Sequence, residues 1–238
     1  SSHKGKSYSQ FGYMEGSYEI DTLNLITFSA NLFGYGYESN GLGTTQMMNA
    51  QRQHAYSYNL VSKSESSSTH FNANFDYQRS FKKKGEYLTF SYRYGTSPNT
   101  NESHTDYDDI KDYPYDASYL YNQFYDNHSR TDEHIFQLDY TNPINKVHSI
   151  DFGGKYILRN NKSESDYYKK SVTDNDYYLD ERPESYYQQR HDIASAYADY
   201  MVKTKKISAK AGVRYEHTFS NVKYEKMPER NFDAGFDN

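Results

Sequence analysis

Apolar and polar residues alternate along most of this chain with a period of two. In the stretch "AYADYMVKTKKISAKAGVRYEH", residues 196–217, small or apolar side chains occupy every second position on either side of a turn. The positions between them carry Asp199, Lys210, Arg214 and Glu216. The same alternation recurs in residues 70–78, 87–94, 134–140 and 150–159. Such alternation is typical of β-strands that have one apolar face and one polar face.

Short polar turns join these strands into three antiparallel hairpins. The loop "FKKKGE", a three-residue "PIN" loop and a two-residue turn at residues 204–205 each bring apolar residues of both strands to the same side, as antiparallel pairing requires. The predicted pairs are Tyr77 with Phe90, Leu138 with Ile150, Val202 with Ile207, and Tyr197 across from Gly212. We expect the aromatic ring of Tyr197 to cover that strand glycine.

Short turns and long connectors alternate along the chain. The turns fall near residues 21–24, 82–85, 143–145 and 203–206, and the long polar connectors span roughly residues 38–68, 98–132 and 160–190. This layout is typical of an outer-membrane barrel, whereas a compact soluble domain rarely holds three long structureless loops. Within the first connector, "AYSYNL" places its tyrosines on even positions, out of phase with Phe71 onward. The strand there bends or bulges, or this is a separate loop strand.

The composition is polar but rich in tyrosine. Only 35% of the residues are hydrophobic, yet 29 Tyr and 13 Phe give 18% aromatic residues, which is unlike a disordered chain. The formal charge is 27 minus 32, or −5, without a basic stripe, so no electrostatic footprint for nucleic acid is present. The chain has no cysteine, which removes disulfides, thiol catalysis and cysteine metal sites.

Apolar faces four or five residues long, at alternate positions, give the nine to eleven residues that a tilted transmembrane β-strand needs. The fold class predicted is therefore all-β: an antiparallel meander of about eight long strands, a segment of a transmembrane β-barrel with short turns at one end and long polar loops at the other. The alternative is a soluble antiparallel sheet with one face in the core and one in water.

Three stretches together resemble the barrel region of TonB-dependent receptors from Bacteroidota, in the subfamily labelled outer membrane β-barrel family protein. They are "DYQRSFKKKGEYLTFSYRY", "FQLDYTNPINKVHSIDFGGKYILRNNKSESDY" and "AYADYMVKTKKISAKAGVRYEHT". The resemblance implies a Gram-negative outer-membrane location, a barrel of about 22 strands, a plug domain in its lumen and energy-coupled import of a bulky ligand. No plug, TonB box or terminal aromatic strand is visible in the sequence, so the chain looks like an internal segment.

We expect residues 8–220 to form the barrel segment. Residues 1–7 are expected to be disordered or foreign to the natural protein, and residues 221–238 to begin a further loop or a disordered tail. Because a segment of a wider barrel has two exposed sheet edges, it is expected either to close on itself as a small barrel or to pair its edges with other strands.

No motif in the sequence supports catalysis. The nine histidines include no H-E-x-x-H, "SFKK" at residues 80–83 lacks the helix that its motif needs, and no carboxylate pair stands out among 32 acids. Acidic loops at residues 105–116 and 173–181 carry oxygen ligands of the kind calcium takes, without the ordered loop of a known calcium motif. We predict no cofactor and no metal, with calcium as the lesser alternative.

Tyrosine-rich loops are the better candidates for ligand binding, because rigid aromatic faces combined with Asn, Gln and Asp give adaptable contact. The candidates are Tyr115, Tyr119, Tyr121, Tyr178 and Tyr187. Alternatively, these tyrosines only extend the strands above the membrane. Polar residues expected to face the lumen are Asp76, Arg93, Asp139, Lys155, Arg159, Asp199, Lys210, Arg214 and Glu216.

The predicted function is a non-catalytic part of a receptor that imports a bulky ligand. Its expected partners are outer-membrane lipid, the plug domain, the remaining barrel strands, TonB indirectly and an unknown ligand, with no nucleic acid. Two alternatives stay open: a small passive outer-membrane barrel, and a soluble or surface-exposed β-sheet binding module such as an adhesin or glycan binder.

Overall fold

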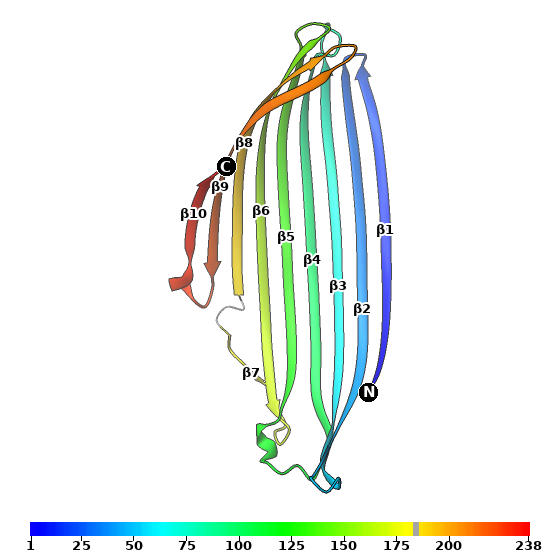
Figure 1. The fold of residues 1–238 in the computed structure, drawn as a ribbon, viewed down its shortest axis with the longest axis vertical. Helices are drawn as coiled ribbons and strands as arrows, with labels where there is room; N and C mark the ends of the chain where they lie inside the picture. The colour runs from blue at the N-terminus through cyan, green and yellow to red at the C-terminus, as the bar shows by residue number, and fades with distance from the viewer. Residues whose placement is uncertain (183–185) are drawn as a thin grey trace.

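The computed structural model describes residues 1–182 and 186–238, which form one antiparallel sheet with the strands in chain order (Figure 1). The eight long strands are β1 (Ser2–Asp21), β2 (Asn24–Met48), β3 (His54–Ser80), β4 (Tyr87–Lys111), β5 (Tyr121–Pro143), β6 (His148–Ser171), β8 (Tyr186–Lys203) and β9 (Ser208–Tyr224). The short elements are β7 (Tyr178–Leu179), β10 (Phe232–Asp237) and the 3₁₀ turns η1 (Ala117–Tyr119) and η3 (Pro228–Arg230). The predicted all-β meander is confirmed.

The sheet is a single layer without a core. Among the described residues, the only buried apolar side chains are Ala30, Ile135 and Val222. Large apolar side chains instead form a band on one face of the sheet near the short turns, at positions such as Phe75, Phe136 and Phe152. We call this the apolar face and its opposite the polar face. Because so much apolar surface is stable only when water is excluded, a medium outside the chain must cover the band.

The hairpin between β3 and β4 has the predicted register, with Tyr77 paired to Phe90. The other two predicted registers are wrong. Leu138 pairs with Gly154 rather than Ile150, and Val202 pairs with Ala209 rather than Ile207. Both turns are longer than expected because a side chain satisfies the backbone amides inside the turn. Since each register differs by an even number of residues, every side chain stays on its predicted face.

The two side chains responsible for the longer turns are Asn145 and Thr204. Asn145 Oδ1 accepts hydrogen bonds from the backbone N–H groups of Val147, at 2.8 Å, and His148, at 3.0 Å. Thr204 Oγ1 accepts from those of Lys206 and Ile207. Asn and Thr side chains stabilise turns in this way, in competition with a tighter hairpin.

The register shift also moves the aromatic cover of a glycine. Tyr197 lies across Gly153 of β6 instead of Gly212 of β9, and a Cβ built at Gly153 would overlap the Tyr197 ring. The Tyr197 hydroxyl donates to Asp139 and accepts from Gln137, which holds the ring flat over the glycine. Gly212 instead faces Asp199, whose carboxylate fills the space above it.

The three long connectors are shorter than predicted. Strands β2 and β3 run on to residues 48 and 54, β4 and β5 to residues 111 and 121, and β6 to residue 171. Backbone pairing therefore continues through most of the polar sequence expected to be loop. A strand of about 25 residues reaches roughly 80 Å, well beyond the hydrocarbon thickness of about 30 Å, so the polar ends extend the sheet on the long-loop side.

The out-of-phase tyrosines of β3 have a simple explanation. The pairing of β3 with β2 keeps one register from Arg79 down to Tyr56, so Tyr56 and Tyr58 lie on the polar face instead of the apolar face. A bulge does occur nearby in the pairing with β4, between Ser57 and Asn59, where Asp109 adopts a φ of 47°. The strand therefore keeps its register, and its aromatic residues move from the apolar face at Phe71 to the polar face at Tyr58 and Tyr56.

The two ends of the chain and the sheet edges differ from expectation. Residues 2–7, expected to be disordered, belong to β1 and pair with β2, and part of residues 221–238 forms β10. Within the described residues β1 pairs only with β2 and β10 only with β9, so the segment does not close on itself (Figure 1). Among these residues no helix is long and apolar enough to span a membrane.

We predict that Gly153→Ala destabilises the fold by about 1–3 kcal/mol, because the new methyl group displaces the Tyr197 ring. The measurement is the free energy of unfolding by urea in detergent micelles. The matched control is Gly154→Ala, where the added Cβ lies 3.7 Å from the Ser195 carbonyl oxygen, an ordinary contact. Equal effects of the two substitutions would contradict the proposed role of Tyr197.

Candidate functional site: the polar face of the sheet

All nine polar residues that the sequence assigned to one side lie on the polar face. Register partners in neighbouring strands place them there, because directly paired residues point to the same side of a sheet. They are Asp76, Arg93, Asp139, Lys155, Arg159, Asp199, Lys210, Arg214 and Glu216. That this face lines a lumen stays a prediction at this point.

The half of the polar face behind the apolar band carries paired charges, and we call it the ionic zone. Glu133 lies between two guanidinium groups: Arg93 is 3.1 Å from its carboxylate, and Arg159 donates from Nε at 2.8 Å. The Glu133 side chain is only 17% exposed. A half-buried carboxylate shared by two arginines makes a strong, geometrically fixed pair.

Further hydrogen bonds and ion pairs connect the same zone across β5, β6, β8 and β9. Lys210 Nζ lies 3.0 Å from Asp199 and 3.6 Å from Asp151. Gln137 donates to Asp139 at 2.7 Å, and Tyr197 donates to the same carboxylate. Positive and negative groups alternate, so the zone has no excess of either sign that would select ions by charge.

The polar face changes character toward the long-loop end. We call this part the neutral wall: the polar-face positions, every second residue, of segments 33–39, 64–70, 97–103, 125–131 and 161–167. Their side chains are Ser, Thr, Asn, Tyr and Phe with one histidine, His70. All Asp, Glu, Lys and Arg residues of these five segments lie on the opposite face. The wall is therefore free of permanent charge.

The five tyrosines proposed as ligand contacts are dispersed around the long-loop end. Tyr115, just before η1, and Tyr119, its last residue, are 70% and 76% exposed. Tyr121 and Tyr178 are brought together by Lys169, whose ammonium lies 5.8 and 5.6 Å from their ring centroids. Tyr187 lies apart from them, on β8, where its ring is tilted against that of Tyr224 with the centroids 6.2 Å apart.

An aromatic cluster that the sequence analysis did not select lies on the polar face of β3 and β4. The Tyr56 ring meets Tyr113 edge-on at 5.5 Å, and the Tyr58 ring meets Tyr107 at 5.3 Å. The signal was present in the sequence as the even-numbered tyrosines of "AYSYNL". It was missed because a change of phase was attributed to the backbone rather than to a change of face.

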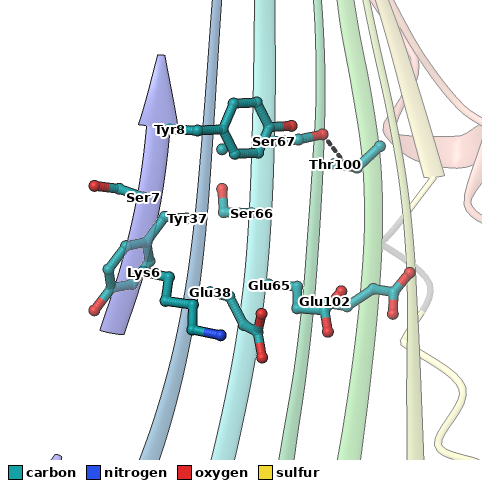
Figure 2. Close-up of a pocket in the computed structure, with 11 residues that line it drawn as sticks. Lys6, Ser7, Tyr8, Tyr37, Glu38, Glu65, Ser66, Ser67, Thr100 and Glu102 are labelled. Atoms are coloured by element: carbon teal, nitrogen blue, oxygen red, sulfur yellow. Dashed lines mark hydrogen bonds between the residues drawn. The ribbon is translucent and has the colours of Figure 1, made fainter. Parts of the chain in front are cut away.

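The opposite face holds a groove of about 450 Å³ above the apolar band, lined by Tyr8, Glu38, Glu65 and Glu102 (Figure 2). Five acids in this region are successive register partners on five strands: Glu38, Glu65, Glu102, Asp126 and Asp166. Like charges in direct cross-strand contact destabilise a sheet unless water or a counter-charge separates them. Lys63 pairs with Glu65 and His128 lies 3.2 Å from Asp126. Glu38 and Glu102 form no ion pair among the described residues, so we expect water to cover this acidic row and the membrane to end below it on that face.

The acidic loops do not assemble a metal site within the part of the chain that the structure describes, where no three His, Asp or Glu side chains come together as ligands. Their carboxylates have local roles instead. Asp109 pairs with Lys111 at 2.9 Å, Asp112 lies 3.6 Å from His54, and Asp116 accepts a hydrogen bond from the Ser118 amide at the start of η1.

Two phenols outside the membrane-spanning segments form hydrogen bonds to strand carboxylates, Tyr177 from the loop after β6 and Tyr186 from the start of β8. Burial, followed by a 2.8 Å hydrogen bond to Asp106, raises the pKa of Tyr177 to about 12. A hydrogen bond to Asp166 raises the pKa of Tyr186 to about 12. Both hydroxyl groups therefore stay protonated and keep donating through the whole physiological pH range.

These features define an outer-membrane β-barrel: long antiparallel strands, an apolar band on one face, a polar opposite face, and short turns at one end. Residues 79–237 match the outer membrane protein beta-barrel family, and the chain belongs to that family. The outer membrane is accordingly its location. No curated protein matches the chain.

The chain is also similar to solved structures. Ferric citrate transporter FecA, in its unliganded form, aligns over 98% of this chain and 40% of its own, with 10% identity and a TM-score of 0.47. The ferric yersiniabactin uptake receptor FyuA from Yersinia pestis aligns over 96% of this chain and 42% of its own, with 10% identity and a TM-score of 0.27. The chain therefore spans about two fifths of the length of these two receptors.

We predict that Glu133→Gln destabilises the protein by about 1–3 kcal/mol, because the arginines on both sides lose their shared carboxylate in a half-buried site. Urea unfolding in micelles measures this effect. The matched control is Glu65→Gln on the opposite face, where the side chain is 49% exposed and pairs only with Lys63. That change is expected to cost less than about 0.5 kcal/mol. If Glu133→Gln costs as little as the control, the ionic zone does not stabilise the fold.

Proposed function

We propose that this chain is a segment of the barrel of a TonB-dependent receptor that imports a bulky ligand across the outer membrane without catalysis. The observation that carries the proposal is the open sheet. Eight long strands with a continuous apolar band do not bring the two outermost strands together. Closing such a sheet without unpaired edges in lipid takes further strands, and a barrel with many strands has a wide lumen.

The two unpaired edges of the sheet also support pairing with further barrel strands. β1 offers a row of free backbone N–H and C=O groups along Ser2–Asp21, and β10 offers a shorter row along Phe232–Asp237. Unsatisfied backbone groups cost several kcal/mol each in hydrocarbon, so each edge is expected to pair with an additional barrel strand. In such a barrel we expect a plug domain to occupy the lumen, as the sequence resemblance implies.

The ionic zone has features that suit contact with a plug. Among the described residues the ammonium group of Lys155 makes no hydrogen bond or ion pair, although it lies amid paired charges on the polar face. Ile135, Ile157 and Ile193 form an apolar row across three strands of that face. A free ammonium group beside an apolar row is better matched by a second protein surface than by open water.

The first expected outcome concerns lipid. The full-length protein that contains this chain is expected to fractionate with outer membranes and to keep its β-sheet circular dichroism only in detergent micelles, because the apolar band needs a hydrocarbon partner. The measurement compares solubility and strand content with and without detergent. If the protein is folded and monodisperse in plain buffer, the proposal is wrong and the chain belongs to a soluble β-sheet binding module.

The second expected outcome concerns barrel size, and it is tested with introduced cysteines, since residues 1–238 contain none of their own. In the full-length protein, Ala234→Cys on β10 is expected to form no disulfide with a cysteine at Ser9, Phe11 or Tyr13 of β1, because further strands separate the two edges. The positive control is Tyr18→Cys with Ile26→Cys, which are direct register partners in β1 and β2. Efficient crosslinking of β10 to β1 would support a small passive barrel instead.

A further inference from the structure

The neutral wall is unusual for a surface in a chain with 25% charged residues. Over its five strand segments, alternation sends every Asp, Glu, Lys and Arg to the other face. Glu38, Glu65 and Glu102, for example, are register partners of one another on the opposite face.

Three cations lie at the border of the wall within the described residues, and each is paired with an acid. Arg159 and Lys169 flank the wall on β6 and pair with Glu133 and Asp180. Arg182, from the segment beyond β7, covers the Tyr167 ring at 3.9 Å and also pairs with Asp180.

A surface without permanent charge selects against charged ligands. A polyanionic or polycationic ligand would lose hydration there without gaining a counter-charge, and that cost is large in a confined space. Hydroxyl and amide groups, in contrast, exchange hydrogen bonds with other hydroxyl and amide groups at little cost. The wall therefore favours an uncharged ligand that carries many hydrogen-bonding groups.

Several polar side chains of the wall have no hydrogen-bond partner in the part of the chain that the structure describes. Among the described residues, the side chains of Asn99, Asn101 and Ser129 form no hydrogen bond, although they lie on adjacent strands near the middle of the wall. Each amide offers two donors and an acceptor oxygen, and the hydroxyl offers one donor. Other members are already paired, as where Asn127 donates to Ser165 Oγ at 2.6 Å. The neighbouring side chains, whose hydrogen bonds are already made, therefore hold these free groups in place.

Aromatic rings stand on both sides of these groups. Successive register partners place Tyr35 of β2, Asn99 of β4 and Tyr187 of β8 in one row across the sheet. The two rings are 40% and 38% exposed, so each has a face available for contact. A flat ring with an apolar face and a polar tip suits a ligand that has both C–H faces and hydroxyl edges.

We infer that the neutral wall binds an uncharged oligosaccharide, with Asn99, Asn101 and Ser129 hydrogen-bonding its hydroxyl groups and Tyr35 and Tyr187 packing against sugar faces. The inference rests on the proposed import function and names the substrate class for it. Tyr187, which was selected from the sequence as a ligand contact, adjoins the wall on β8, where it is the register partner of Ser163. An uncharged peptide shares the hydrogen-bonding chemistry but lacks the repeated ring faces that two separated tyrosines match.

The test is a binding array with the full-length receptor in detergent micelles. The immobilised probes are neutral oligosaccharides, uronate- or sulfate-bearing oligosaccharides of the same lengths, and end-blocked uncharged peptides. Binding is expected only in the neutral oligosaccharide class. Preferential binding of acidic oligosaccharides or of peptides, or of no oligosaccharide at all, would overturn the inference.

Variants at adjacent positions locate the site. Asn101→Lys is expected to weaken binding of the best neutral oligosaccharide at least tenfold, because it places a charge on the wall. Thr100→Lys, at the preceding residue, puts the same charge on the opposite face and is expected to change binding less than twofold. Asn101→Ala, which only removes the amide, is expected to weaken binding several-fold. Heat-dependent gel mobility verifies that each variant is folded. Equal effects of Asn101→Lys and Thr100→Lys would refute the assignment.

Uptake by cells with and without TonB separates this inference from the proposed function. TonB-dependent uptake of the bound neutral oligosaccharide is the expected result. TonB-dependent uptake of an acidic ligand, without uptake of neutral oligosaccharide, would refute the inference and leave the import function standing. Binding of neutral oligosaccharide that is lost in Asn101→Lys, without TonB-dependent uptake, would refute the import function and leave the wall as a glycan-binding surface.

Discussion

The structure depends on one constraint, the unbroken antiparallel register that links β1 through β9. Because directly paired residues point to the same side, the pairing with one strand fixes which residues of the next strand lie on each face. Phe75, Tyr92 and Phe136 share the apolar face for this reason, although no core holds them there. The register is also robust, since the two turns that differ from expectation shift their strands by even numbers of residues. A shift of one residue would have turned the whole charged set of β9 toward lipid.

The same constraint divides the polar face along its length. Behind the apolar band, charges are paired closely, as in the contact of Glu133 with Arg93 and Arg159. At that depth the surrounding dielectric is low and an unpaired charge is costly, so pairing is favoured. Beyond the band, water reaches both faces and charge is no longer excluded from either. The absence of charge from the neutral wall therefore has no explanation in membrane insertion, and a ligand accounts for it better.

The sequence predicted the fold well because a period of two is a local signal, and Tyr77 and Phe90 could be paired from the turn between them. It failed where a side chain altered a turn, since nothing in the alternation tells that Asn145 or Thr204 will bind backbone amides. It also took polar strand ends for loops, because alternation of Ser with Glu or Lys carries no apolar signal. The neutral wall was missed for a related reason. In the sequence, Asn101 and Ser129 cannot be told from ordinary loop residues, and only the pairing of neighbouring strands shows that they share a face.

The distribution of charge beyond the membrane follows from two demands on the same strands. Strands that extend far above the hydrocarbon need charged groups to stay hydrated and to avoid sinking into lipid. Those groups fall on the face that carries the acidic row from Glu38 to Asp166, where they keep that surface in water. The polar face is then free to be uncharged. Alternation thus lets a single strand such as β4 present Glu102 to the outside and Asn101 to a ligand, which neither a helix nor a loop could do over so many consecutive residues.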